Sequence, residues 1–311
     1  MMKIGYFADG PWSHNAIQNI VDSELFKIVF IVPRYDRQDP VLKGWAEKLK
    51  IPFLATENVN SEEFILSLDE YKPDLMVSMS FDQILKKNII NYAPKGFINC
   101  HAGALPFYRG RNPLNWVLIN GEDSFGITVH YIDQGIDTGD IIEQRKYPIT
   151  LKDSYGSLLN TAVSECANVL ISAMEKISKN DLNIIKQKDI HPIGTYFGMR
   201  TFGDEVIDFS LPAMKVFNFI RAISSPGPGA RFWVNDIEYA IEESSLIANA
   251  PVYTSTIGEV IGKDEKGIVI KVGDSSIYIN KIRKVKDKEM LKLTTPNFRI
   301  GTRLSNKPLS I

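Results

Sequence analysis

The sequence has few cysteines and lacks any long apolar run. Its two cysteines, Cys100 and Cys166, are too few for a disulfide framework or a cysteine-based metal site. No apolar run approaches the length of a membrane-spanning helix, and the first residues lead into an apolar strand pattern without a secretory leader. We therefore expect a cytoplasmic protein that holds no metal and has no membrane partner.

An excess of charge of either sign is also absent. The chain has 36 lysines and arginines against 37 aspartates and glutamates, which gives a formal net charge of −1. Proteins that bind nucleic acid usually carry a basic surface, so nucleic acid is not the expected partner, although a local basic patch stays compatible with this balance. With 311 residues, 44% hydrophobic and 23% charged, the chain is long enough for two folded domains.

Short apolar runs occur at intervals along the first two hundred residues, and helical patterns lie between them. The runs at Lys3–Ala8, Phe26–Val32, Leu75–Met79 and Phe97–His101 are typical of buried strands. A short strand is also predicted over Pro52–Leu54, and a capped amphipathic helix over Ser61–Tyr71. Their alternation with helices predicts a Rossmann-like, doubly wound, mostly parallel α/β sheet. The loop after the first run contains a single glycine, Gly10, so the GxGxxG fingerprint of dinucleotide-binding proteins is absent.

The pattern changes near residue 200. A helix is predicted over Ala213–Ile223, and short β-rich runs such as Ile237–Ile241 and Gly267–Val272 follow it. Several short strands separated by turns predict a small open β-barrel that resembles an oligonucleotide-binding (OB) fold. We therefore expect a catalytic domain over residues 1–201 and an OB-like β-barrel domain over residues 202–311.

Polar residues gather at turns within Gly96–Ile142. Asn99 and His101 end an apolar strand, and their spacing of two places both side chains on one face. The predicted strand Gly126–Ile132 leads into a turn with three acids. These acids are Asp133, Asp137 and Asp140. An amide, an imidazole and a carboxylate are the groups that acyl transfer to an amine requires. The residues alone do not select one of the three acids, and a buried Asn and His bonded to backbone is the alternative interpretation.

The spacing of these residues resembles that of the folate-dependent formyltransferases. The shared pattern is Asn-x-His, Leu-Pro-x-Tyr-Arg-Gly, Gly-x-Thr-x-His and Asp-x-Gly-Asp. In this sequence it comprises Asn99, His101, Leu105, Pro106, Tyr108, Arg109, Gly110, Gly126, Thr128, His130, Asp137, Gly139 and Asp140. The segment Arg109–Glu122 is most similar to nucleotide-sugar N-formyltransferases, such as those acting on UDP-4-amino-4-deoxy-L-arabinose. The likeness covers nearly the whole chain and weakens after about Ala240.

The resemblance implies N10-formyltetrahydrofolate as the co-substrate and assigns three catalytic roles. Asn99 would stabilise the oxyanion, His101 would move the proton, and Asp137 would orient the imidazole. The implied folate contacts are Gln83, Ile84, Leu85, Arg111, Asp133, Gln134, Gly135 and Ile136. The implied substrate contacts are Gly10, Ser13 and Arg109. Gly103-Ala104 stands where the family commonly has Ser-Leu, and we expect this difference to enlarge the pocket.

Three acceptor amines compete. The segment Arg109–Trp116 favours a nucleotide-linked amino sugar, and a UDP-linked 4-amino-dideoxy sugar for a surface glycan is the first expectation. Initiator methionyl-tRNA is the alternative, but the loop Pro33–Pro40 is short and mixed in charge where the tRNA enzymes carry a basic insertion. Glycinamide ribonucleotide is disfavoured because its formyltransferase lacks a second domain. A non-catalytic folate-binding protein is disfavoured because all three catalytic positions are filled. The sequence leaves open whether the chain forms a homodimer.

Overall fold

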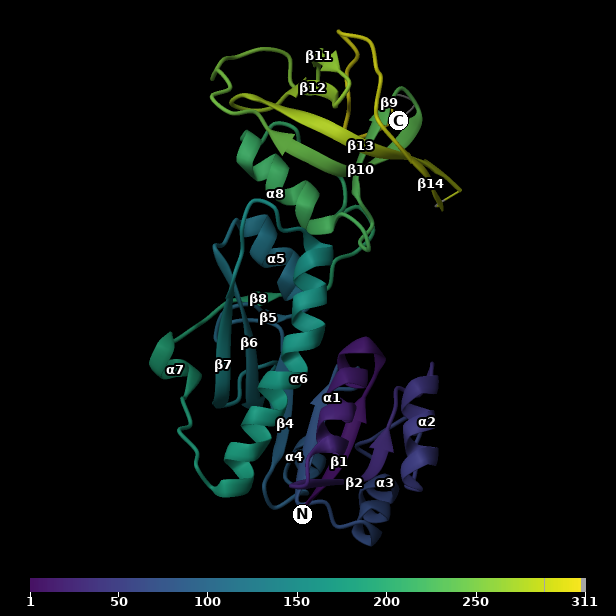
Figure 1. Ribbon diagram of the computed structural model, residues 1–311, viewed down its shortest axis with the longest axis vertical. Helices are drawn as coiled ribbons and strands as arrows, with labels where there is room; N and C mark the ends of the chain where they lie inside the picture. Colours follow the sequence, from purple (N-terminus) through teal and green to yellow (C-terminus); the bar gives the residue numbers. More distant parts are fainter. Residues whose placement is uncertain (288, 309–311) are drawn as a thin grey trace. The chain divides into compact units, whose positions relative to one another are not determined.

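The computed structural model describes residues 1–287 and 289–308, and its chain divides into two compact units (Figure 1). The first unit comprises Met1–Pro113, Ser124–Pro148 and Asn160–Gly198. The second unit comprises Leu114–Asp123, Ile149–Leu159 and Met199–Ile311. The predicted boundary between residues 201 and 202 stays a prediction. None of the helices in the described part of the chain is long and apolar enough to cross a membrane.

A six-stranded sheet with the order β2-β1-β3-β4-β6-β7 forms the centre of the first unit. Its strands are β1 (Met2–Ala8), β2 (Phe26–Val32), β3 (Leu75–Met79), β4 (Phe97–His101), β6 (Ser124–Tyr131) and β7 (Ile141–Pro148). The first four strands pair in parallel, whereas β6 runs antiparallel to β4 and β7 antiparallel to β6. This mixed sheet confirms the predicted α/β class. Because β6 runs antiparallel to its neighbour β4, the β6 residues that pair with Asn99 and His101 also lie at the carboxyl end of β4.

Helices and a short strand pair complete this part of the chain. They are α1 (Gly10–Asp22), α2 (Pro40–Leu49), α3 (Glu62–Ser67), the 3-10 turn η1 (Leu68–Glu70), α4 (Lys87–Ile90), β5 (Arg109–Gly110), α6 (Tyr155–Lys179), α7 (Gln187–Ile190) and β8 (Tyr196–Phe197). The Ser61 hydroxyl accepts a hydrogen bond from the Phe64 amide and caps α3, as the sequence predicted. The strand predicted over Pro52–Leu54 is reduced to one parallel bridge with β2, between Ile31 and Phe53.

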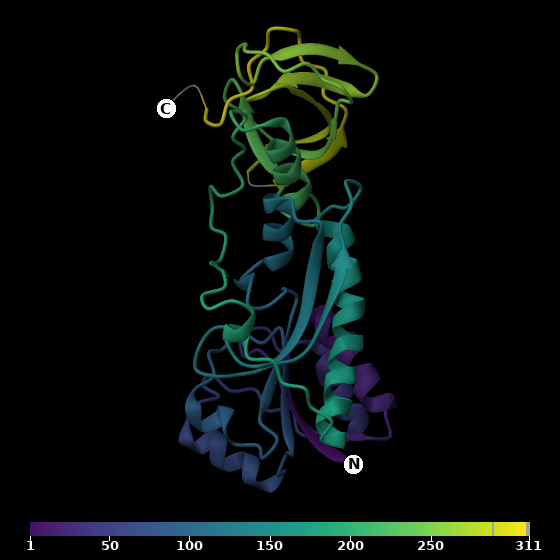
Figure 2. The same cartoon turned by 90° about the vertical axis from the view of Figure 1, so that its left-hand side faces the viewer.

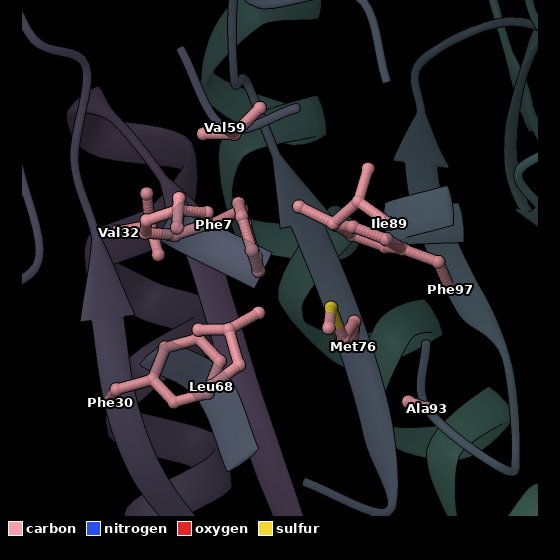
Figure 3. Packing of buried hydrophobic residues seen from close by; sticks show 10 residues of the cluster. Phe7, Phe30, Val32, Val59, Leu68, Met76, Ile89, Ala93 and Phe97 are labelled. Atoms are coloured by element: carbon pink, nitrogen blue, oxygen red, sulfur yellow. The ribbon is translucent and has the colours of Figure 1, made fainter. Parts of the chain in front are cut away.

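Aromatic side chains fill the core beneath the sheet (Figure 3). Phe7 lies at the centre, with its ring centroid 6.0 Å from that of Phe30 and 4.9 Å from that of Phe97. Gly5 is required here, because a Cβ atom at this position would lie 2.4 Å from the Phe30 ring. Met76 and Leu68 pack in the same cluster, so β1, β3 and β4 are held as one rigid platform.

Antiparallel strands build the second unit, in the order β11-β12-β13-β10-β9, with β14 paired to β13. Its elements are α5 (Pro113–Asn120), α8 (Ala213–Ile223), β9 (Ala230–Val234), β10 (Ile237–Leu246), β11 (Val260–Asp264), β12 (Gly267–Lys271), β13 (Ser276–Lys286) and β14 (Glu289–Thr294). Figure 2 shows these strands curling around a common centre. This antiparallel sheet confirms the predicted fold class, an α/β part followed by a small β-barrel of the OB-like type, and α8 has the bounds that the sequence predicted.

Candidate active site

The carboxyl end of β4 places two polar side chains beside the end of β6. Asn99 opposes His130 and His101 opposes Thr128 in the β4–β6 register. Opposed residues of antiparallel strands point to the same face, so all four side chains gather on one side of the sheet. The amide Nδ2 of Asn99 lies 3.4 Å from Nε2 of His130. The motif histidine His130 therefore belongs to the site, although the sequence assigned it no role.

Asp137 lies between two imidazoles. Its Oδ2 is 3.7 Å from Nδ1 of His101, and its Oδ1 is 3.5 Å from Nε2 of His130. The backbone N–H of Gly110 donates a hydrogen bond of 2.9 Å to Oδ2. The structure thus brings together the three predicted catalytic residues, Asn99, His101 and Asp137, and selects Asp137 as the acid that meets the imidazole.

Backbone carbonyls orient both rings. Nε2 of His101 lies 2.7 Å from the Tyr108 carbonyl oxygen, and Nδ1 of His130 lies 2.7 Å from that of Tyr131. A carbonyl oxygen only accepts, so each of these ring nitrogens must carry the proton and donate it. The remaining nitrogens, Nδ1 of His101 and Nε2 of His130, therefore face the carboxylate of Asp137. A proton gained by either ring would be stabilised there by the negative charge.

The electrostatics of the site keep Asp137 ionised. Burial alone raises the pKa of its carboxyl group. The charge of His101, the hydrogen bond and charge of His130 and the Gly110 N–H together lower this pKa by more, so it lies well below its usual range. At neutral pH Asp137 is consequently a carboxylate that accepts hydrogen bonds and cannot supply a proton.

A glycine makes room for the His101 ring. A Cβ atom at Gly103 would lie 2.6 Å from His101 Nε2 and 2.8 Å from the Tyr108 carbonyl oxygen. The space freed by the absent side chain is thus occupied by the imidazole and its hydrogen-bond partner. The expectation that this glycine enlarges the pocket stays a prediction, but the structure gives it a local reason to be there.

The turn that leads to Asp137 is held by its own side chains. Asp133 Oδ1 accepts hydrogen bonds from the Gly135 N–H at 3.0 Å and from the Thr138 hydroxyl at 2.5 Å. Asp133, Gln134 and Gly135 are exposed, and Ile136 keeps 51% of its surface accessible. The predicted folate segment is therefore an ordered, exposed turn with an uncovered apolar side chain.

A second exposed segment follows β3. The Gln83 side chain is held in the structure, because its Oε1 accepts from the Val59 N–H at 3.0 Å and its Nε2 donates to the Thr56 carbonyl at 3.1 Å. Ile84, by contrast, is 77% exposed, and its carbonyl accepts a hydrogen bond from Asn60. This segment therefore offers backbone groups and the Ile84 side chain to a ligand, with Leu85 packed against the core.

The other predicted contact residues differ in whether their polar groups are already hydrogen-bonded within the chain. Gly10 donates its N–H to Asp39, and the Ser13 hydroxyl donates to the Gly10 carbonyl at 2.7 Å, so both are engaged at the end of β1. The guanidinium of Arg109 donates to Gln187 and to the Ile193 carbonyl. Arg111, which follows Gly110 in the sequence, is exposed. Their predicted ligand contacts stay predictions.

Sequence reasoning missed two residues of the site. His130 could have been found, because it closes the Gly-x-Thr-x-His pattern. Gln187, whose amide contacts the backbone of the Asp137 turn, gave no signal because it lies 50 residues further along the chain. Within the described residues, no group of three or more His, Cys, Asp or Glu side chains is arranged to hold a metal.

Comparison with known proteins gives the same family for both parts of the chain. Residues 6–174 match the family Formyl transferase, and residues 201–294 match the family Formyl transferase, C-terminal domain. The methionyl-tRNA formyltransferase of Halothermothrix orenii is 32% identical over 276 residues, which are 85% of this chain and 83% of the relative. The bifunctional polymyxin resistance protein ArnA of Wigglesworthia glossinidia brevipalpis is 36% identical over 199 residues, which are 64% of this chain and 30% of the relative.

Solved structures show the same fold. The N-formyltransferase from Helicobacter canadensis in complex with folinic acid and dTDP-3-aminofucose matches with a TM-score of 0.70 and 22% identity, and the match covers 90% of this chain and 99% of that one. The first family match alone extends over more than half of the 311 residues. The enzyme class predicted from the Asn-x-His and Asp-x-Gly-Asp motifs is thereby confirmed, and the chain belongs to the formyl transferase family.

Proposed function

We propose that this enzyme transfers the formyl group of N10-formyltetrahydrofolate to the amino group of a nucleotide-linked amino sugar. The observation that carries the proposed chemistry is the ionised Asp137 held between two oriented imidazoles, beside the amide of Asn99. This arrangement has a proton acceptor, a charge that stabilises the protonated ring, and an oxyanion donor in one place.

Each catalytic side chain is suited to one step. Nδ1 of His101 is 3.7 Å from Asp137, too far for a hydrogen bond, so it remains available to take a proton from the attacking amine. The Asp137 carboxylate stabilises the resulting positive ring, which can return this proton to the folate nitrogen as the bond between that nitrogen and the formyl carbon breaks. The Nδ2 group of Asn99 can donate to the negative charge that develops on the formyl oxygen, and one such donor is typically worth about 3 kcal/mol.

The residues proposed to hold the folate fit a flat heterocycle. N10-formyltetrahydrofolate supplies the formyl group when bound. The exposed side chains of Ile84 and Ile136 offer apolar surface, and the backbone around them offers donors and acceptors. Arg111 adds an exposed cation that suits a carboxylate of the folate. The chemistry of these segments therefore supports the folate assignment from the sequence.

The loop Pro33–Pro40 supports a sugar rather than tRNA as the acceptor. Arg37 donates to Asp9 at 2.9 Å, and Arg34 donates through two nitrogens to the Ser80 carbonyl while lying 3.4 Å from Asp9. Both cations are thus engaged within the chain and leave little positive charge for phosphates. The N-formyltransferase from Helicobacter canadensis, whose structure contains dTDP-3-aminofucose, favours the same conclusion. The identity with methionyl-tRNA formyltransferases keeps methionyl-tRNA as the second candidate.

An acceptor panel tests the proposal. The purified chain is mixed with N10-formyltetrahydrofolate and, in turn, UDP- and dTDP-linked amino sugars or methionyl-tRNA, and the products are identified by mass. UDP-linked 4-amino-dideoxy sugars are the first to test. Formylation of a nucleotide sugar that Asp137→Asn abolishes would support the proposal. Formylation of methionyl-tRNA alone would overturn the sugar acceptor and leave the catalytic roles standing. No turnover together with folate binding would favour a non-catalytic protein. The expected cytoplasmic location remains a prediction.

A further inference from the structure

Gln187 connects two parts of the active site through its side-chain amide. Its Oε1 accepts hydrogen bonds from Nε and Nη2 of Arg109, at 3.0 and 2.7 Å. Its Nε2 donates to the carbonyl oxygens of Asp137 and Gly139, each at 2.8 Å. An amide has two acceptor lone pairs and two N–H groups, so this side chain is fully satisfied. Its orientation is also fixed, because only Oε1 can face the guanidinium.

The contacts bear on Asp137 because the backbone there needs support. Asp137 has φ = 53°, a left-handed backbone conformation that is unfavourable for a residue other than glycine. The neighbouring Gly110 donates its N–H to the carboxylate, while Arg109 reaches the backbone of the same residue through Gln187. The dipeptide β5 thus holds both the side chain and the main chain of the proposed catalytic acid.

Gln187 cannot act by touching a substrate. It is 3% exposed, and all its hydrogen-bonding groups have partners within the chain. It also lies outside both family matches, which end at residue 174 and resume at residue 201. Its contacts therefore point to an indirect role, in setting where the Asp137 turn sits.

We propose that Gln187 is a positioning residue that holds the Asp137 carboxylate at its place between His101 and His130. The proposal rests on the catalytic role proposed for Asp137. Loss of the two donations to the turn lets the carboxylate move away from the rings. Because displacements of about 1 Å can cost about 100-fold in rate, turnover is sensitive to this support while substrate binding is not.

The substitution Gln187→Glu isolates the relevant contacts. A glutamate keeps the size of the side chain and accepts from Arg109, but its oxygens cannot donate to the two carbonyls. We expect kcat to fall between about 10-fold and about 100-fold, with KM for both substrates within about twofold of the parent enzyme. Gln18→Glu makes the same change at an exposed position of α1 and should leave both parameters unchanged.

A readout without turnover separates this proposal from the proposed function. The chain has four histidines, so the imidazole signals of His101 and His130 can be assigned by NMR and compared at one pH in the absence of any substrate. In Gln187→Glu we expect the ring signals of both histidines to move, because the Asp137 carboxylate no longer lies at its place between them.

Two outcomes would overturn the proposal. One is a folded Gln187→Glu enzyme with the parent kcat and the parent ring signals of His101 and His130. The other is an equal loss of kcat and rise of KM with unchanged ring signals, which would indicate general disturbance. If Gln187→Glu does not fold, Arg109→Lys removes the paired donors from the other end and should give the same NMR shifts. The ring signals need no substrate, so they stay informative even if the acceptor panel fails.

Discussion

His130 joins two of the proposed catalytic side chains, because its ring lies between Asn99 and Asp137. Its Nδ1–H is committed to the Tyr131 carbonyl, so Nε2 is the only nitrogen that can face them. This ring is one of the groups that lower the pKa of Asp137. His130 thus affects both the orientation of the Asn99 amide and the ionisation of the Asp137 carboxyl group.

Replacing His130 with glutamine should therefore change the pH dependence of Asp137 ionisation. The Asp137 pKa should rise towards its ordinary value, because a group that lowers it is lost while the burial that raises it remains. The titration of the Asp137 carboxyl group itself, followed by NMR, should therefore have its midpoint at higher pH in the variant than in the parent enzyme. A titration identical to that of the parent enzyme would show that His130 does not influence the acid.

Gly103 gives a second test at the scale of one atom. In Gly103→Ala the new Cβ must displace the His101 ring or the Tyr108 carbonyl, which breaks the hydrogen bond that orients the imidazole. We expect kcat to fall at least about 10-fold, with a proton-transfer group misplaced. Gly44→Ala is the matched control, because nothing lies within 4 Å of a Cβ there. It lies in α2 and should stabilise the helix by about 1 kcal/mol. Equal activity of both variants would contradict the proposed ring orientation.

At the scale of elements, Asp39 connects helix α2 to the loop after β1. Its Oδ1 accepts from the N–H groups of Val41 and Leu42 and caps α2, while its Oδ2 contacts the Gly10 N–H and the His14 ring. Burial raises the pKa of this carboxyl group, but the hydrogen bonds and His14 lower it by more, so the net pKa is below its usual range. The Asp39 side chain thus fixes the first turns of both α1 and α2.

The free energy of unfolding should reflect this lowered pKa. A carboxylate with a lowered folded-state pKa contributes stability above its unfolded pKa of about 3.9, and this contribution is lost as the pH falls through the folded value. We expect Asp39→Ala to cost about 1–2 kcal/mol at pH 7 and less below about pH 4, measured by urea unfolding. Asp181→Ala, at an exposed aspartate, should change little at either pH. A pH-independent difference would indicate that the cap acts without its charge.

The bounds of strands and helices were predictable from the sequence where a single local pattern determines them. The apolar runs of β2, β3 and β4, and the helix α8, have the bounds read from the sequence, because burial on both faces or one apolar stripe marks their ends. Pro52–Leu54 has a similar local pattern, but it pairs with β2 only at the bridge between Ile31 and Phe53. The strand that a segment pairs with is often distant in the sequence, so the existence of a short strand cannot be predicted from its local pattern alone.

The same distinction holds for the site. Asn99 and His101 share one strand, so their spacing alone places them on one face. Choosing Asp137 over Asp133 and Asp140 needed the family pattern, since three acids in one turn are equivalent until the chain folds. Gln187 was out of reach, because its four contacts join segments 48 to 78 residues away.

For the whole molecule, the balance of charge bears directly on the acceptor. A polyanion is attracted by cations that lose their counterions on binding, and that attraction falls steeply with salt. The chain has a net charge of −1, and the arginines of the loop Pro33–Pro40 are paired with Asp9 or held by a backbone carbonyl. A nucleotide sugar carries only a few charges and needs no such extended basic surface.

The affinity for tRNA therefore separates the two candidate acceptors. We expect labelled methionyl-tRNA to bind the full chain more weakly than about 10 µM at physiological salt, measured by fluorescence anisotropy, since even non-specific binders with basic surfaces reach only about 1 to 100 µM. Asp9→Asn provides the internal comparison, because it removes the carboxylate that holds Arg37 and lies near Arg34. This variant should bind tRNA more tightly and with a steeper salt dependence than the parent chain. Tight, steeply salt-dependent binding by the parent itself would mean that its cations are arranged for phosphates after all, and the acceptor would then be methionyl-tRNA.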